Sequence, residues 1–183
     1  MTRLAFLSLI GLVALPVTAH AQATSALKGH DGNAPIDFEA DRIEVQDRAD
    51  RVVLSGNVHV KQQELTLDSA RMTVAYANNG STTDVQRLDA SGNVVLKSPS
   101  ETATGAFAIY DVNKRIITML GNVVLTRGTN VVRGGRLVFN LVDGRATVDG
   151  SAVGGTAQPG GRVSGRFTVP KRDANAPAAT QPN

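Results

Sequence analysis

Three short stretches decide the fold of this 183-residue chain: Gly56-Asn57-Val58-His59-Val60, Gly92-Asn93-Val94-Val95-Leu96 and Gly121-Asn122-Val123-Val124-Leu125. Each begins with Gly-Asn-Val and continues with apolar residues at alternate positions. The glycines are 36 and then 29 residues apart, and a degraded copy follows another 29 residues on, at Gly150. Self-similarity at a nearly constant period predicts a stacked architecture in which each unit buries its apolar face on its neighbours. We expect each glycine to lie where a strand kinks at a corner.

Alternation of apolar and polar residues extends outward from these repeats. It runs from Ile36 to Asp41 and is found again within residues 65–68 and 72–76. A period of two is typical of half-buried β-strands. The dipeptide Asn79-Gly80 predicts a tight turn, and residues 77–84 around it predict the longest interior loop. The sequence therefore predicts an elongated, antiparallel all-β body with an aliphatic inner face and a polar outer face.

The two ends of the chain predict segments outside this body. Arg3, the apolar residues 4–15 and the small-x-small pattern at 19–21 are typical of a secretory signal peptide over residues 1–21. The apolar run is shorter than the roughly 20 residues that span a bilayer. We expect a flexible N-terminus over residues 22–34, one β domain over 35–169 and a disordered tail over 170–183. The mature chain is therefore expected to be exported.

Composition limits what stabilises the domain and what it meets. The chain has no cysteine and no tryptophan, so an exported domain relies on backbone pairing and an aliphatic core rather than on disulfides. Residues 22–110 carry 8 basic and 12 acidic side chains, whereas residues 111–172 carry 10 basic and 3 acidic ones. The basic half is suited to an anionic partner or to the acidic half of a second copy. Chance drift over so few charges explains the same asymmetry equally well.

The sequence lacks the motifs that commonly mark enzyme chemistry. There is no nucleophile elbow, no phosphate-binding loop and no dinucleotide fingerprint, so we expect neither an enzyme nor a cofactor. Beyond residue 21 only His30 and His59 are histidines, which argues against a transition-metal site. Asp37, Glu39 and Asp41 share one strand face, but strand spacing is too wide for a compact calcium cage. Scarce aromatic residues argue against nucleic acid as a partner.

Residues 36–169 resemble the OstA-like family. The stretch Pro35 to Asp41 is similar to the opening strand of that family, the Gly-Asn-Val strands to its core, and Arg133-Gly134-Gly135-Arg136-Leu137-Val138-Phe139 to its R-G-x-R-L-V stretch. The resemblance implies an elongated antiparallel β-jellyroll of roughly sixteen strands, open along one seam, with a hydrophobic interior. The degraded repeat at Gly150 departs from the family pattern and leaves the C-terminal edge undefined.

The resemblance also implies a function. It is that of a periplasmic lipopolysaccharide-binding transport protein that shields the acyl chains of lipid A and bridges inner- and outer-membrane complexes. The implied partners are lipopolysaccharide, an inner-membrane LptC-like protein at one end, an outer-membrane LptD-like protein at the other, and further copies of the chain joined head to tail. Strand addition across unpaired edges would make those joints. We expect the edges to be residues 36–40 and 162–169.

The predicted lipid contacts are the apolar residues on the inner parity of the strands, which should line a channel wide enough for acyl chains. Parity is ambiguous near Tyr110, where Phe107 and Ile109 compete with Ala108. The alternative is a structural or interaction β-repeat protein of the periplasm whose interior is packed and binds no lipid. Basic side chains at 127, 133, 136, 145, 162 and 166 are candidates for phosphate contacts or for a solvated outer face. The predicted lining residues are Ile36, Phe38, Ile43, Val45, Val58, Val60, Leu65, Leu67, Met72, Val74, Leu96, Tyr110, Val123, Leu125, Leu137 and Phe139.

Overall fold

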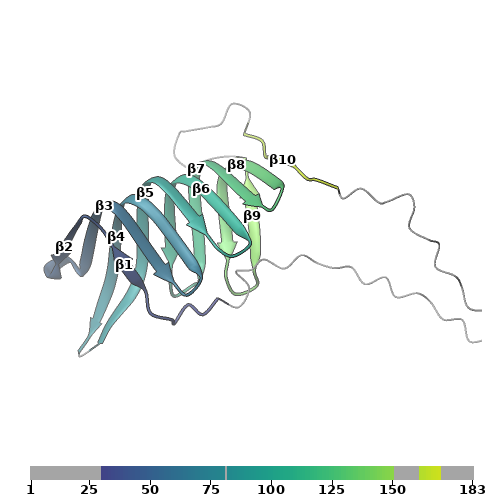
Figure 1. The fold of residues 1–183 in the computed structure, drawn as a ribbon. Coiled ribbons are helices and arrows are strands. Elements are labelled where there is room, and N and C mark those ends of the chain that lie inside the picture. Colours follow the sequence, from purple (N-terminus) through teal and green to yellow (C-terminus); the bar gives the residue numbers. More distant parts are fainter. Residues whose placement is uncertain (1–29, 81, 151–160, 170–183) are drawn as a thin grey trace, which may run out of the picture.

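The computed structural model describes residues 30–80, 82–150 and 161–169, and it confirms the predicted antiparallel all-β fold. Expectations for the signal peptide and the tail after residue 169 lie outside the described residues. In these residues, ten strands form a single sheet in which β3 to β8 pair in chain order, β1 and β2 both pair with β3, and β9 and β10 both pair with β8 (Figure 1). One 3-10 turn, η1 (Asp47–Ala49), interrupts them. The strands are β1 (Asp37–Glu39), β2 (Arg42–Gln46), β3 (Arg51–Gln62), β4 (Leu65–Asn79), β5 (Thr82–Lys97), β6 (Glu101–Asp111), β7 (Ile116–Arg127), β8 (Asn130–Asn140), β9 (Arg145–Asp149) and β10 (Ser164–Arg166).

The Gly-Asn repeats are β-bulges, as the sequence predicts. Gly92 and Asn93 both have positive φ, at 82° and 50°, and the same holds for the other two Gly-Asn pairs. At each pair the register between neighbouring strands shifts, in β3, β5 and β7 alike. Two residues of the bulged strand then face one residue of the next strand, which bends the sheet there.

The bulges require small residues on the neighbouring strand. A Cβ placed on Gly92 would lie 2.8 Å from the Cβ of Ala70, and one placed on Gly121 would lie 2.8 Å from the Cβ of Ala106. Opposite the bulge of β7, β8 has Gly135. Small residues therefore line both sides of the bend at the bulges of β5 and β7, where the sheet can fold over sharply, whereas the side chain beside Gly56 is that of Asp41.

The bend divides the sheet into two layers that face each other. Layer A contains β1, β10 and the segments 58–62, 65–69, 94–97, 101–105, 123–127 and 130–134. Layer B contains β2, β9 and the segments 51–55, 71–79, 82–91, 107–111, 116–120 and 136–140. Each of the six strands β3 to β8 contributes one segment to each layer, and β1, β2, β9 and β10 each contribute one segment to a single layer. This gives sixteen segments, so the expected sixteen strands and the ten observed describe the same sheet.

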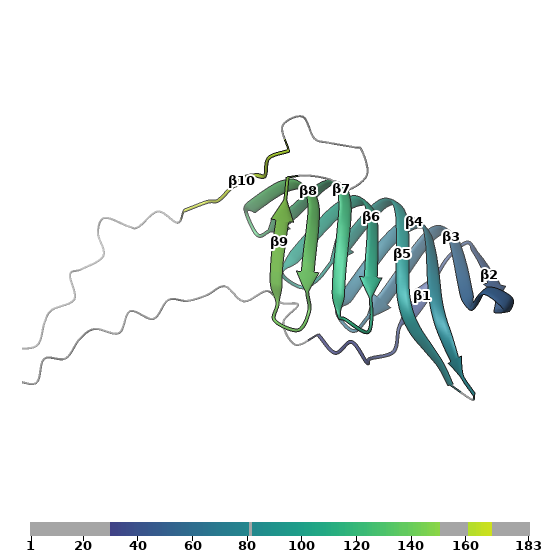
Figure 2. The ribbon, with the colours of Figure 1, turned by 180° about the vertical axis from the view of Figure 1, so that it is seen from behind.

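Seen from behind, the strands follow one another along an elongated body (Figure 2). β2 and β1 lie at one end, and β9 and β10 lie at the other. The sheet does not close on itself, because each end strand has a neighbour on one side only. Within the described ranges no helix is long and apolar enough to cross a membrane.

The prediction of a loop over residues 77–84 is wrong. β4 continues to Asn79 and β5 begins at Thr82, and their register runs to the end of the hairpin. Gly80 has φ 74° and makes the tight turn that Asn79-Gly80 predicts. These strand ends extend beyond the core, so backbone pairing holds them together without apolar alternation. Because the alternation is missing, the sequence pattern predicts a loop there.

Candidate functional site

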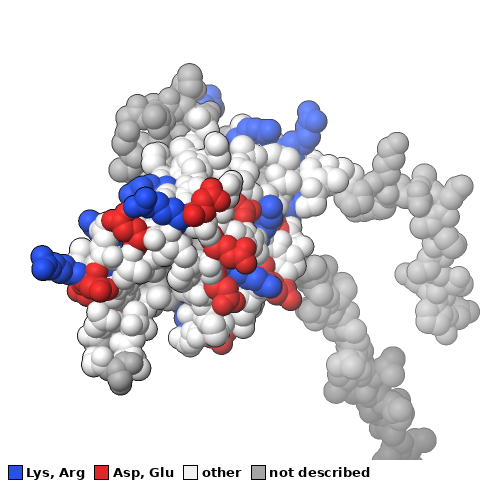
Figure 3. All heavy atoms as spheres, turned by 60° about the vertical axis from the view of Figure 1, so that its left-hand side comes forward, with Lys and Arg blue, Asp and Glu red and all other residues white. Residues whose placement is uncertain are grey.

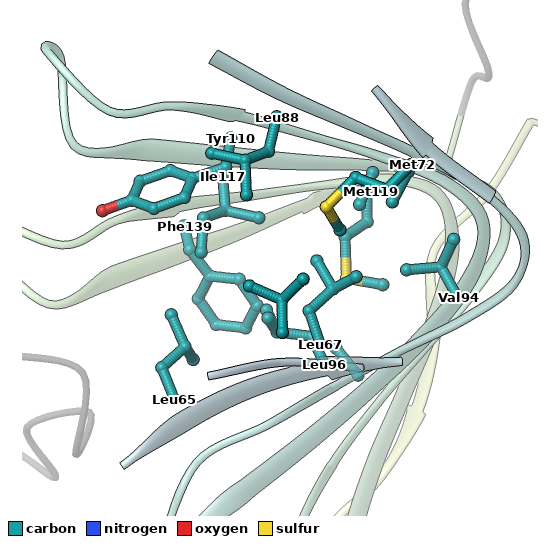
Figure 4. Close-up of a cluster of buried hydrophobic side chains, with 14 of the residues drawn as sticks. Leu65, Leu67, Met72, Leu88, Val94, Leu96, Tyr110, Ile117, Met119 and Phe139 are labelled. Carbon is teal, nitrogen blue, oxygen red and sulfur yellow. The ribbon is translucent and has the colours of Figure 1, made fainter. Parts of the chain in front are cut away.

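The space between the layers is filled by apolar side chains from every long strand. Met72, Met119 and Leu137 are fully buried and lie in layer B. Val94 and Val123 meet them from layer A, next to the bulges. In Figure 4 the strands curve around the side where Val94 lies and diverge towards the side of Tyr110 and Leu65. The interior is therefore closed along the bend and bounded by strand ends along the opposite side, which we call the rim.

Most of the predicted lining residues lie in this interior. Ile36, on the chain before β1, is half-buried and packs against the same cluster. Tyr110 is buried with Ala108, whereas Phe107 is 54 % exposed, which settles the ambiguous parity of β6. The structure places the buried lining residues in the interior, and their contact with lipid stays a prediction. The buried members are Val58, Val60, Leu65, Leu67, Met72, Val74, Leu96, Tyr110, Val123, Leu125, Leu137 and Phe139.

Three predicted residues are exposed instead of buried: Phe38 at 41 %, Ile43 at 49 % and Val45 at 60 %. They still lie on the inner side of the sheet. Phe38 pairs with the buried Val60, and Ile43 pairs with the buried Leu54, and directly opposed residues of antiparallel strands point to the same face. They are exposed because β1 and β2 form one end of the sheet, where no further strand among the described residues covers them.

Several buried residues are not apparent from the sequence. Leu54 follows two valines, Ile117 follows Ile116 and Met119 precedes Leu120, so an apolar doublet hides which member faces inward. Leu88 is buried as well and follows a polar run. Each of them pairs with a predicted lining residue on β4, β6 or β8, which places it inside. This strand register is the information that would have identified them from the sequence.

A cavity lies at the rim between the layers. Its free volume is about 20 Å³, which is room for little more than one water molecule. The expected channel, wide enough for acyl chains, is therefore not open in this structure, because side chains of the two layers meet and fill it. The cavity is lined by Ile36, Val60, Gln62, Leu65, Leu67, Leu88, Leu96, Tyr110 and Ile117.

A polar contact joins the two layers at the cavity. The Tyr110 hydroxyl, from layer B, donates to Gln62 Oε1, from layer A, over 3.2 Å. Burial raises the pKa of Tyr110, and nearby Arg115 opposes this shift only in part. The phenol therefore stays protonated and remains a donor. Both residues lie near strand ends far from the bend, so this bond lies where the layers would separate most easily.

The N-terminal segment lies against the same glutamine. The Gln62 amide donates to the carbonyl oxygens of Gly32 and Ala34 over 3.1 and 2.9 Å, and its Oε1 lies 3.0 Å from His30 Nε2. Of the N-terminus that the sequence predicts to be flexible, residues 22–34, residues 30–34 make these contacts at the rim, and residues 22–29 lie outside the described residues. Gln62 is only 3 % exposed, and the alternation pattern gives no sign of a buried amide.

A second buried polar residue lies on the rim of layer A. The carboxylate of Glu101, at the start of β6, accepts a charge-assisted bond from Arg127 at the end of β7. A buried carboxylate needs such a partner, because desolvation of an unpaired charge is costly. Arg127 is thus committed to this pair. Among the other candidate phosphate contacts, Arg133, Arg145, Arg162 and Arg166 are exposed and Arg136 is half-buried; phosphate binding by these residues stays a prediction.

On the side of the molecule shown in Figure 3, Lys and Arg side chains lie close to Asp and Glu side chains. On layer A, Asp68 contacts His59 Nδ1 at 2.6 Å and Lys97 Nζ at 3.3 Å. Partial burial raises the pKa of Asp68, but the hydrogen bonds from His59 and Lys97 outweigh it and leave the pKa lowered. The stabilisation from Asp68 is therefore present above its unfolded pKa and is lost as the pH falls through its folded pKa. In the described part of the chain, no three His, Cys, Asp or Glu side chains are grouped to hold a metal ion.

Comparisons with known proteins agree with this architecture. A family model described as "LptA/(LptD N-terminal domain) LPS transport protein" matches residues 37–145. An uncharacterised protein of Rhizobium meliloti (strain 1021) is 36% identical over 158 residues, covering 81% of this chain and 84% of the relative. Among solved structures, the fold is similar to LptH of Pseudomonas aeruginosa, the LptA-homologous periplasmic component of the lipopolysaccharide transport device. The TM-score is 0.67 and the identity 20%, over 76% of this chain and 99% of that one.

Proposed function

Because the chain belongs to the LptA/(LptD N-terminal domain) family of LPS transport proteins, we propose that it carries lipopolysaccharide through the periplasm with the lipid A acyl chains sheltered between its layers. The observation that carries this proposal is the continuous aliphatic interior, bounded along one side by a rim with a cavity. A buried methylene is worth about 0.8 kcal/mol, so a twelve-carbon chain exposed to water costs on the order of 10 kcal/mol. Shelter alone therefore makes transit possible, and no catalytic step is required.

Acyl chains enter, in this proposal, by separating the layers at the rim. Covalent and bulge connections hold the layers together along the bend, whereas at the cavity the polar link between them is the Tyr110–Gln62 hydrogen bond. A neutral hydrogen bond contributes only about 1 kcal/mol, far less than burial of an acyl chain. Side chains that line the cavity from the two layers, such as Leu67 and Ile117, would then pack against lipid instead of against the opposite layer.

A photo-reactive amino acid at Ile117 tests the lipid contact. Ile117 lines the cavity and is 1 % exposed, whereas the next residue, Thr118, points to the outer face of the same strand and is half-buried. We expect adducts with lipopolysaccharide from position 117 and none from 118, after irradiation in Gram-negative cells that export the protein. Adducts from 118 alone would contradict the proposal.

The ends of the sheet are suited to joining copies of the chain and its partners. β1 at one end carries Asp37 and Glu39, and β10 at the other carries Arg166; all three are exposed. Opposite charge at the two edges favours head-to-tail strand addition. In the proposed bridge, an inner-membrane LptC-like protein docks at one end and an outer-membrane LptD-like protein at the other. Stacked copies would continue the interior from one molecule to the next.

The variant Val45→Lys tests docking at the end of the sheet formed by β1 and β2. Val45 is 60 % exposed on the inner side of β2, and burying a valine is worth roughly 1.5–3 kcal/mol. We expect the charge to weaken self-association about tenfold or more, measured by sedimentation equilibrium. Phe107→Lys is the matched control, because Phe107 is similarly exposed but lies on the outer face, away from both ends. Equal loss in both variants would contradict edge docking.

A packed structural protein without a lipid ligand is the second candidate, and the small cavity of about 20 Å³ favours it. The two functions differ in what the protein carries. Protein purified in mild detergent from a Gram-negative periplasm should contain bound lipopolysaccharide if it is a carrier. Absence of lipid from such a preparation, together with a failure to bind added lipopolysaccharide, would leave only a rigid spacer.

A further inference from the structure

The segment from His30 to Ile36 crosses the rim between the two layers. On layer A, Gly32 and Ala34 accept hydrogen bonds from Gln62, and the Asp31 N–H donates to Gln63 Oε1 over 3.3 Å. On layer B, a Cβ placed on Gly32 would lie 3.2 Å from Arg115 Nε, in the turn between β6 and β7. Both ribbon views show the segment running beneath the ends of the strands, on the side away from the bend (Figures 1 and 2).

We propose that residues 30–36 are a strap that closes the lipid entry, and that Gln62 is the positioning residue that holds the strap in place. This inference rests on the proposed carrier function. Ile36, at the end of the strap, lines the rim cavity together with Leu65 and Tyr110. The strap therefore occupies the place that the first methylenes of an acyl chain would take, and lipid must displace it to enter.

The hydrogen bonds of Gln62 explain how the strap is held and how it is released. A glutamine side chain offers two N–H donors and an oxygen with two acceptor positions. Both donors go to strap carbonyls, and the oxygen lies within hydrogen-bond distance of His30 and of the Tyr110 hydroxyl. A buried amide without partners is costly, so the strap satisfies Gln62 when the rim is closed. Water can take over these bonds once the rim opens, which makes release reversible.

The strap is short, small and internally folded. The Asn33 N–H donates to Asp31 Oδ1 over 2.9 Å, and the Ala34 N–H donates to the Asp31 carbonyl over 3.1 Å. Gly32 is buried, and the rest of the strap before Ile36 has no large apolar side chain to anchor it. Attachment is thus mainly polar, and the apolar contact is concentrated at Ile36. Such a segment can leave the rim without exposing much apolar surface of its own.

A disulfide across the rim tests the strap directly. The variant is Gly32→Cys/Arg115→Cys. A Cβ at position 32 would lie 3.4 Å from Cγ of Arg115, which is about the position that Sγ of a cysteine at 115 would take, so the two sulfurs can form a disulfide. The chain has no cysteine of its own. We expect the oxidised protein to bind fluorescent lipopolysaccharide at least about tenfold more weakly than the same protein after reduction, because a locked rim lowers the binding-competent fraction.

The outcomes separate the strap from the carrier function. Equal binding by oxidised and reduced protein would overturn the strap and leave the carrier function standing. If wild-type protein binds no lipopolysaccharide, the proposed function is overturned and the strap with it.

A second pair of variants tests Gln62 without a crosslink. Gln62→Met keeps the size of the side chain but cannot donate to Gly32 and Ala34, so we expect lipopolysaccharide to bind about tenfold more tightly and residues 31–34 to exchange their amide hydrogens faster. Tyr110→Phe is the matched control, because it removes the bond between the layers and leaves both bonds from Gln62 to the strap intact; strap exchange should be unchanged. Wild-type binding and exchange in Gln62→Met would overturn the inference.

Discussion

Replacing Phe139 with alanine is expected to lower the free energy of unfolding by about 3–5 kcal/mol, the usual cost of removing a buried phenylalanine. Phe139 is 2 % exposed, on β8. Its ring faces Leu65 and Leu96 across the interior, near the buried Glu101. The deletion therefore removes contacts between the layers as well as within layer B. Urea denaturation followed by circular dichroism measures the change.

Phe107→Ala provides the comparison for this experiment. The same side chain is removed from the neighbouring part of the sheet, but Phe107 is 54 % exposed on the outer face of β6, so we expect a change within about 0.5 kcal/mol. A loss of stability similar to that of Phe139→Ala would mean that the parity of β6 is reversed, with Ala108 and Tyr110 outside the interior.

The variant Gly92→Ala should lose about 2–5 kcal/mol of stability for two separate reasons. The left-handed backbone of Gly92, at φ 82°, costs an L-residue roughly 1–2 kcal/mol. The new Cβ would also lie 2.8 Å from the Cβ of Ala70, and overpacking of this kind costs typically 1–3 kcal/mol. Thermal and urea denaturation measure the sum.

Two further variants separate the causes. Gly80→Ala has the same backbone demand, at φ 74°, but no atom lies within 4 Å of its new Cβ, so only the backbone cost of roughly 1–2 kcal/mol is expected. Ala70→Gly, added to Gly92→Ala, removes the opposing Cβ and should restore the part due to the contact. No recovery in the double variant would show that the bulge does not depend on close approach of β4 and β5.

The architecture could be predicted well because it repeats. Gly-Asn-Val recurs at nearly the period of one hairpin, and each copy lies at a bulge with positive φ at both Gly and Asn. Of the sixteen residues that alternation predicts to line the interior, twelve are buried. A residue such as Leu67 follows the pattern because its strand is paired on both sides and has one face covered. Local pattern and tertiary environment agree wherever a strand is in the middle of the sheet.

Prediction from the sequence failed for residues outside the middle of the sheet, where burial depends on more than the local pattern. Ile43 and Val45 alternate like core residues, but β2 ends the sheet, and no further strand of the described part of the chain covers its inner side. Gln62 reads as the polar end of a strand, and its burial depends on residues 30–34, whose arrival at the rim is a long-range contact that no local pattern encodes. The small volume of the rim cavity, about 20 Å³, could not be predicted from the sequence either, because alternation shows which side chains point inward and not how closely they meet.

The alignment of the bulges on β3, β5 and β7 makes the domain modular. Each pair of strands brings its own corner, its own glycine and its own share of the apolar filling, and it bonds only to the pair before and the pair after. Duplication of one such pair, for example residues 82–111, would lengthen the body by two strands and leave both terminal edges unchanged. The length of the protein can thus change in whole hairpins, through tandem duplication, without any redesign of its ends.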